Sequence, residues 1–108
     1  MDAKIKNLVE QASRSEKSIE SYLTKQVSAI GGLCLKYTNG NITGYPDRIV
    51  LIPGGWTRWV EIKSKGKHPT RLQQERHKEL EAVGQTVHVI DSREEVDALI
   101  NIWKLLII

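Results

Sequence analysis

The chain has 108 residues, of which 40% are hydrophobic, and this predicts a single domain over residues 1–108 with one modest core. No apolar run approaches the ~20 residues of a membrane span and no secretory signal is recognisable, so we expect a cytoplasmic protein without a membrane partner. The net charge of +3 and the pI of about 9.1 permit nucleic-acid binding without requiring it.

Residues 4–30 are predicted to be helical, because apolar side chains recur with helical spacing. Two stripes carry this pattern: Ile5, Leu8, Val9 and Ala12, then Ile19, Tyr22, Leu23, Val27 and Ile30. Ser13-Arg14-Ser15 separates them, which predicts two helices or a bend, with Ser15 or Ser13 capping the second helix. Gly31-Gly32 then ends the helical segment.

The next element is a strand over residues 33–38, in which Leu33 and Leu35 alternate with Cys34 and Lys36. Cys34, predicted to be buried, is the single cysteine and cannot form an internal disulfide, which fits a reducing compartment. Residues 39–44 are rich in turn-forming residues and lead to the next strand.

Two apolar runs, 49–52 and 59–62, are joined by Pro53-Gly54-Gly55-Trp56-Thr57 and predict a β-hairpin. A hairpin folded about Gly54 or Gly55 is expected to place Asp47 opposite Ile62 or Lys63. Glu61 and Lys63 share one face of their strand, because side chains alternate with period two. Two acids and a lysine therefore converge at one end of the ribbon.

Convergent carboxylates suit a divalent cation, since Mg²⁺ and Mn²⁺ prefer oxygen ligands. Lys63 could hold an attacking water or offset phosphate charge. The plainer alternative is a salt bridge at a strand end. Residues 63–74 follow directly with several basic side chains and no acid. Beside a metal site this loop would gather a phosphate backbone, and elsewhere it would be an ordinary solvated loop.

Pro69-Thr70 predicts the start of a helix over residues 71–83, with Thr70 and Gln73 in capping-box spacing and Gly84 at its end. Its expected inner face contains Leu72, Leu80 and Val83. A strand over residues 85–91 and a helix from Ser92 through Trp103 follow. The apolar end, residues 103–108, either completes the core or packs against another chain.

Pro46-Asp47 followed by Glu61-Ile62-Lys63 resembles the PD-(D/E)xK nuclease signature. The fuller order of motifs resembles the virus-type replication-repair nuclease (VRR-NUC) domain, and the resemblance covers most of residues 16–96. Its further motifs are a helical glutamate, Gly31-Gly32, Lys36-Tyr37, Gly44-Tyr45-Pro46-Asp47-Arg48, Pro53-Gly54-Gly55, Val60 before the Glu61 motif, Gln73, and Gly84 before the last strand.

The resemblance implies an α/β fold with a restriction-endonuclease-like core, in which a mixed central sheet is flanked by helices. It further implies a Mg²⁺- or Mn²⁺-dependent endonuclease of a bacterial or phage-infected cell, homodimeric and acting on branched DNA, particularly as a Holliday-junction resolvase. A helical glutamate would complete the acidic cluster, for which Glu20 is preferred to Glu16, and Gln73 would assist.

The expected site residues can then be grouped by role. Asp47, Glu61 and Glu20 would ligate the metal with the Ile62 carbonyl, and Lys63 would position the nucleophilic water. DNA contacts are expected from Lys36, Arg48, Lys65, Lys67 and Arg71.

Other activities have less support. The three histidines lack zinc-ligand spacing, and no glycine-rich nucleotide-binding motif is present, so no nucleotide cofactor is expected. Two alternatives to junction cleavage stay open: a structure-specific nuclease that trims flaps or ends, and a non-catalytic DNA-binding module with the nuclease fold.

Overall fold

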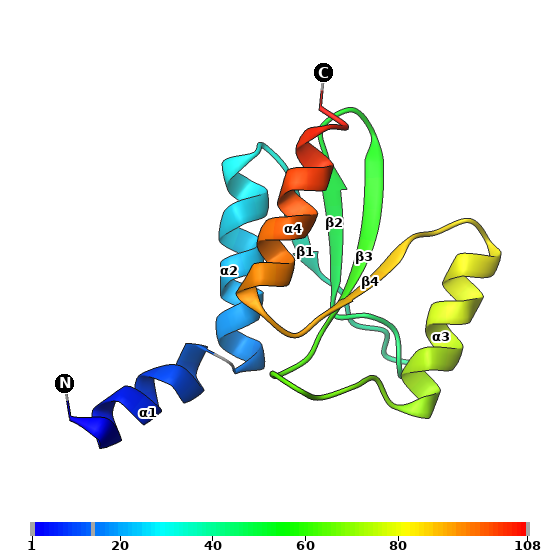
Figure 1. Ribbon diagram of the computed structural model, residues 1–108. Helices are drawn as coiled ribbons and strands as arrows, with labels where there is room; N and C mark the ends of the chain where they lie inside the picture. Colours follow the sequence, from blue (N-terminus) through cyan, green and yellow to red (C-terminus); the bar gives the residue numbers. More distant parts are fainter. Residues whose placement is uncertain (1, 14, 108) are drawn as a thin grey trace.

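A computed structural model describes residues 2–13 and 15–107 of the chain (Figure 1). The elements are α1 (Ala3–Ser13), α2 (Glu16–Ala29), β1 (Leu33–Lys36), β2 (Arg48–Ile52), β3 (Trp56–Ile62), α3 (Arg71–Ala82), β4 (Val87–Ile90) and α4 (Arg93–Lys104). Their order is the predicted one. None of these helices is both long and apolar enough to cross a membrane.

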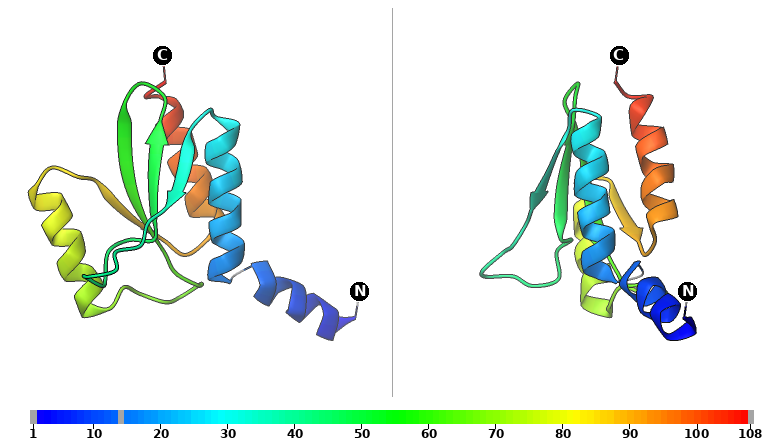
Figure 2. Two further views of the ribbon diagram at one scale, coloured as in Figure 1. Left: turned by 180° about the vertical axis from the view of Figure 1, so that it is seen from behind. Right: turned by 90° about the vertical axis from the view of Figure 1, so that its left-hand side faces the viewer.

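The break between the first two helices falls at Ser15, which caps α2. Its side chain accepts a hydrogen bond from the Ser18 N–H at 3.1 Å, satisfying one of the free donors at the helix start. The helix α1 stands away from the body of the molecule (Figures 1 and 2), and its Ile5 and Leu8 are exposed. The described part of the first apolar stripe therefore contributes nothing to the core.

The sheet is mixed and its strands lie in the order β1-β2-β3-β4. The pairs β1–β2 and β2–β3 are antiparallel, whereas β3 and β4 are parallel. The helix α3 makes the crossover that a parallel pair requires. This arrangement confirms the expected α/β fold with a mixed sheet flanked by helices.

The core lies between one face of the sheet and the two helices α2 and α4, which stand side by side on that face (Figures 1 and 2). The helices contribute Ile19, Leu23, Val27, Val96, Leu99, Ile100 and Trp103, and the strands contribute Val50, Ile52, Val60, Ile62 and Ile90. Trp103 is 1% exposed, so it completes this core. Ile102 and Leu105 are exposed, and Ile108 lies outside the described residues.

The helix α3 lies beyond β4, on the other side of the sheet from α2 in the view of Figure 1. Its buried residues are His77 and Leu80, whereas Leu72 and Val83 are exposed. The predicted inner face was wrong at these two positions, because only a narrow stripe of α3 is covered. The loop before β2 also packs on α3, since the Thr43 carbonyl accepts a hydrogen bond from Arg76 Nε at 2.9 Å.

Candidate active site

The hairpin brings Asp47 level with Glu61. Ile52 pairs with Trp56 across the loop and Arg48 pairs with Val60, so one further step along the ladder sets Asp47 opposite Glu61. The prediction that Asp47 lies opposite Ile62 or Lys63 was therefore wrong by one or two residues. The hairpin loop spans residues 53–55 and centres on Gly54, which sets the observed register. Directly opposed residues share a face, which keeps the two carboxyl groups on the same side of the sheet.

Asp47 is held at both its backbone and its side chain. Its carbonyl accepts a hydrogen bond from the Tyr37 N–H at 2.9 Å, and its Oδ2 accepts one from the Ile62 N–H at 2.9 Å. The preceding Pro46 is buried and restricts the approaching backbone. The carboxylate of Asp47 is thus oriented by a backbone hydrogen bond and also interacts with the carboxyl group of Glu61.

Glu61 is 1% exposed. Burial raises the pKa of its carboxyl to about 9, with the neighbouring Asp47 adding to the rise and Lys63 opposing it. On the α3 side, His77 Nε2 lies 3.2 Å from Glu61 Oε1. Burial also lowers the pKa of His77, so that imidazole is neutral at neutral pH. In the metal-free protein Glu61 therefore retains a proton at pH 7.

The contact between His77 and Glu61 was missed by sequence reasoning. The only signal in the sequence was the position of His77, three residues before Leu80 and one turn after Gln73. This spacing puts His77 on the covered stripe of α3. A histidine in contact with a buried carboxyl group orients that group without having to touch a substrate.

Gln73, expected near the site, takes part in the N-terminal cap of α3. The side-chain Oε1 of Gln73 accepts a hydrogen bond from the Thr70 N–H at 2.9 Å, and the backbone N–H of Gln73 donates to Thr70 Oγ1 at 3.2 Å. This is the complete capping box that the spacing predicted. In this rotamer the side-chain oxygen is engaged by the cap.

The two helical glutamates have different surroundings. Glu20 Oε2 accepts a hydrogen bond from Arg48 Nε at 3.0 Å in a partly buried ion pair. The pKa of Glu16 is raised by burial and then by the negative charge of Asp47, with Lys63 opposing. Glu16 in turn raises the pKa of Glu61. Glu16 therefore interacts electrostatically with the Asp47–Glu61 pair, whereas Glu20, the acid expected from the sequence, is paired with Arg48.

The donor set fits a magnesium-type ion. Among the side chains that the structure describes, at residues 2–8 and 15–107, no group of three or more histidine, cysteine or acidic side chains is placed to hold a metal ion. Mg²⁺ needs no such cage in proteins, because it is commonly held by one or two carboxylates and keeps several waters. Asp47 and Glu61 supply two carboxyl groups, and the raised pKa of Glu61 marks a place where a cation would replace a proton.

The expected DNA-contacting cations are distributed around this centre. Lys36 is the cross-strand neighbour of Arg48. Lys65 Nζ lies 3.8 Å from an oxygen of Asp91, and Arg71 makes a 3.6 Å ion pair with Glu75, one turn further along α3. Lys67 is exposed. The structure thus places Lys65 and Lys67 on the loop after β3, Arg71 at the start of α3, and the Lys36–Arg48 pair on β1 and β2.

The sheet, the opposed Asp47 and Glu61, and Lys63 two residues further on define a restriction-endonuclease-like nuclease fold. Comparison with known proteins supports this class. A solved structure described as "VRR_NUC domain" superposes with a TM-score of 0.75 and 31% sequence identity, covering 80% of this chain and 94% of that one. No family model matches the sequence.

A curated relative is "Putative nuclease p44" from Acyrthosiphon pisum secondary endosymbiont phage 1. It is 40% identical over 79 residues, which are 73% of this chain and 85% of the relative. The chain belongs to the VRR-NUC family of nucleases.

Proposed function

We propose that the protein is a Mg²⁺- or Mn²⁺-dependent DNA endonuclease. The observation that carries this is the pair Asp47 and Glu61, two carboxyl groups level on one sheet face, with the pKa of Glu61 raised to about 9. Such perturbed, adjacent carboxyl groups are typical of sites that bind a cation for catalysis. Membership of a nuclease family supports hydrolysis of a phosphodiester as the reaction.

Each residue would have a distinct part in the reaction. Asp47, Glu61 and the Ile62 carbonyl would hold the metal, which when bound supplies charge neutralisation and activation of water. Lys63 is close enough to influence the pKa values of Glu16 and Glu61, and its ammonium group would orient the nucleophilic water. His77 would act as a positioning residue that keeps Glu61 turned towards Asp47.

We further propose that branched DNA is the substrate and that two copies act together as a Holliday-junction resolvase. One active site cuts one strand, whereas resolution of a four-way junction requires two symmetric cuts. A two-fold dimer would present two identical sites at a fixed separation. The support for this finer assignment is the family resemblance together with the small size of the domain.

The experiment compares Asp47→Asn and Glu61→Gln with the wild type on four-way junctions, flaps and plain duplexes. Each change preserves side-chain shape and removes a carboxyl group that would bind the metal as a carboxylate. Cleavage with Mg²⁺ or Mn²⁺ is expected to fall by about 10³-fold, which is about 4 kcal/mol of transition-state stabilisation, while binding to DNA survives. The matched control is Glu75→Gln, at an exposed position of α3, which should cleave like the wild type.

The outcomes separate the proposal from its competitors. Wild-type cleavage that continues in EDTA, or near-normal rates for either variant, would contradict the metal-site assignment. Cleavage of flaps or ends with junctions left intact would favour the trimming nuclease. DNA binding without cleavage in either metal would favour the non-catalytic module.

A further inference from the structure

The connection from β3 to α3 begins with a tight turn over residues 64–67. The Lys67 N–H donates to the Ser64 carbonyl at 2.9 Å, and Gly66 has a φ of 83°. A glycine with positive φ as the third residue is typical of a type II turn. The N–H of Gly66 takes no part in the hydrogen bond that closes the turn, so it can donate to an acceptor elsewhere in the molecule.

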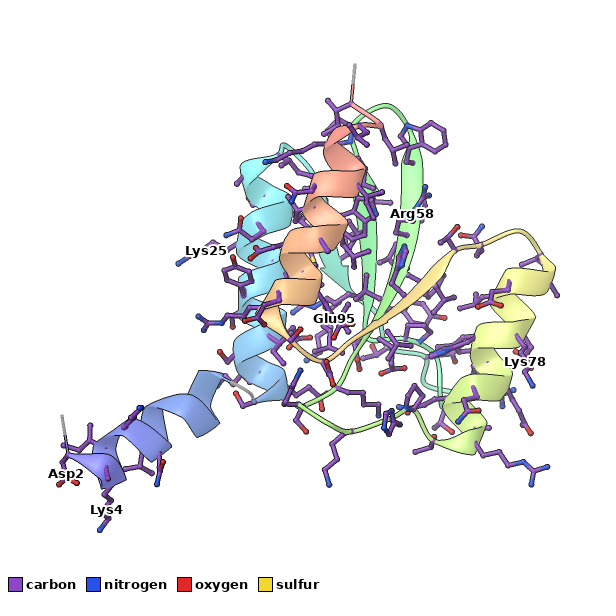
Figure 3. The ribbon with its side chains drawn as sticks, in the orientation of Figure 1. Asp2, Lys4, Lys25, Arg58, Lys78 and Glu95 are labelled. Atoms are coloured by element: carbon purple, nitrogen blue, oxygen red, sulfur yellow. The ribbon has the colours of Figure 1, made fainter. Side chains whose placement is uncertain are left out.

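Asp91, the first residue after β4, supplies that acceptor. Its Oδ2 accepts a hydrogen bond from the Gly66 N–H at 3.0 Å, and its Oδ1 lies 3.8 Å from Lys65 Nζ. The pKa of Asp91 is lowered, first by a hydrogen bond with the side chain of Glu95 in the first turn of α4 (Figure 3) and then by the one from Gly66. Asp91 is therefore ionised at neutral pH, with both carboxylate oxygens directed to the turn.

The start of α4 does not account for this use of the Asp91 side chain. The helix is capped by Ser92, whose Oγ accepts a hydrogen bond from the Glu95 N–H at 3.1 Å. Asp91 contributes its backbone N–H to the same cap, through a 3.2 Å hydrogen bond to Glu95 Oε1. Residues 65–68 are exposed, so hydrophobic packing does not hold the turn. The carboxylate of Asp91 is what fastens it to the end of β4.

The turn lies at the same end of the sheet as the candidate active site. The Ile62 N–H donates to Asp47 Oδ2, and the Lys63 N–H donates to the Ile90 carbonyl at 2.9 Å. The turn starts at Ser64, whose backbone nitrogen is within about 7 Å of that of Ile62, because two residues of chain span no more. A phosphate held at Asp47 therefore has the turn close beside it.

The two lysines of the turn differ in their surroundings. Lys65 is paired with Asp91. Lys67 is exposed and, among the residues that the structure describes, has no acidic side chain within 4.0 Å. Its ammonium group is thus available to a phosphate oxygen, a contact that does not depend on base sequence.

We propose that Asp91 is a positioning residue that holds the 64–67 turn so that Lys67 contacts the DNA backbone beside the scissile phosphate. This inference rests on the proposed function, because it concerns how the same site binds its substrate. The charge of an acid next to a DNA-binding segment by itself repels phosphate. The effect of the Asp91 charge and the effect of its hydrogen bond to Gly66 on DNA affinity are therefore opposite in sign, and variants can separate them.

The first test measures hydrogen exchange at the Gly66 amide by NMR in EDTA. Asp91→Ala removes the acceptor, so exchange should be about tenfold faster than in the wild type. Asp91→Asn keeps an oxygen that can accept from Gly66, and its exchange should stay near the wild-type rate. Both variants should fold, since Asp91 lies outside the helices and strands and its side chain is 24% exposed. Equal exchange in the wild type and Asp91→Ala would overturn the proposal.

The second test measures binding of a fluorescent four-way DNA junction by anisotropy in EDTA. Asp91→Ala should weaken binding about 3- to 10-fold, whereas Asp91→Asn should bind at least as tightly as the wild type. Glu94→Ala is the matched control, because it removes the charge of an exposed acid in the first turn of α4, and its affinity should not fall. In cleavage assays Asp91→Ala should raise KM more than it lowers kcat, since Lys63 is held by its own hydrogen bond to Ile90. Equal affinities for Asp91→Ala and Asp91→Asn, or a loss confined to kcat, would overturn the proposal.

The third test asks whether Asp91 acts through Lys67. Lys67→Gln should lower the slope of log K against log salt by about 0.9, the value for one phosphate contact on duplex DNA. In the Asp91→Ala background the same change should lower the slope by about half as much. Lys78→Gln, at an exposed lysine that projects from α3 (Figure 3), should leave the slope unchanged.

A full effect of Lys67→Gln in the Asp91→Ala background, or equal effects of Lys67→Gln and Lys78→Gln, would overturn the proposal. If the wild type fails to cleave DNA in Mg²⁺ or Mn²⁺ but these binding changes occur, the proposed function fails and the role of Asp91 stands.

Discussion

At the scale of single residues, the site depends on a carboxyl group kept neutral by its surroundings. Glu61 lies between Asp47 and His77, and burial raises its pKa from 4.5 to about 9. The low exposure that raises this pKa also strengthens any interaction with a cation, because few waters compete for the carboxyl oxygens. A metal that displaces the proton would therefore gain two ionised carboxylates in a prepared position.

Glu61 should make the stability of the metal-free protein fall with rising pH. In the unfolded chain this group ionises near pH 4.5, whereas in the folded chain it holds its proton up to about pH 9. The folded state thus binds the extra proton between these values. The contribution is fully present below pH 4.5 and is lost as pH rises through 9, at up to about 1.4 kcal/mol per pH unit.

The measurement is thermal unfolding in EDTA between pH 7 and 9, a range that avoids the titration of His77, whose pKa is lowered. The melting temperature of the wild type should fall across this range, and that of Glu61→Gln should fall less. Glu75→Gln should retain the wild-type slope. Identical slopes for wild type and Glu61→Gln would contradict the raised pKa.

The two helical glutamates can be separated by matched variants. Glu16→Gln should reduce cleavage about tenfold or more, equivalent to about 1.4 kcal/mol, because Glu16 interacts electrostatically with Asp47 and Glu61. Glu20→Gln should reduce cleavage less, since its partner is Arg48. Single-turnover rates at saturating metal provide the comparison. The opposite ranking would restore Glu20 as the acid that acts in the site.

At the scale of elements, α3 is connected to the site by the cap at its N-terminus and by a side chain from its middle turn. The capping box of Thr70 and Gln73 fixes where the helix begins, and His77 reaches Glu61 from its covered stripe. Gly44, with φ of 96°, lets the incoming loop approach α3, since an added Cβ would lie 3.0 Å from Leu72 Cγ. The same helix therefore packs against the segment that delivers Asp47.

The role of Gln73 can be tested against its capping partner. If Gln73 acts through the cap, Gln73→Ala and Thr70→Ala should each lower the free energy of unfolding by about 1 kcal/mol and leave kcat nearly unchanged. Denaturant unfolding and cleavage kinetics would be measured on both. A loss of kcat in Gln73→Ala that Thr70→Ala does not share would instead assign the amide to the reaction.

At the scale of the whole molecule, α2 and α4 cover one face of the sheet (Figure 2), and Trp103 of α4 is part of the core between them and the strands. Deletion of residues 103–108 would consequently remove a core side chain and destabilise the fold itself. Trp103→Ala should cost about 3–5 kcal/mol of stability, a large fraction of the ~5–15 kcal/mol that is ordinary for a domain. Thermal unfolding followed by circular dichroism should show a lower melting temperature, whereas retention of the wild-type value would contradict this account of the core.

The proposed homodimer predicts a dependence of paired cutting on protein concentration. On a plasmid-borne cruciform, a dimer should make both cuts in one encounter and yield linear DNA, while dilution to monomers should yield mostly nicked circles. Light scattering over the same concentrations should show the matching change in mass. A monomer at micromolar concentration that still makes paired cuts would exclude the dimer.

The sequence by itself determined the order of elements, the cap at Thr70, and the convergence of Asp47, Glu61 and Lys63, and it narrowed the cap of α2 to Ser13 or Ser15. These features depend on local spacing: a capping side chain, a short loop, and alternation along a strand. The tertiary structure alone decided the exact register of Asp47 against Glu61, the pairing of Glu20 with Arg48 and the contact of His77 with Glu61. It also decided that Trp103 is buried. Those outcomes depend on how each helix is rotated against the sheet. The packing of residues that are distant in sequence determines this rotation.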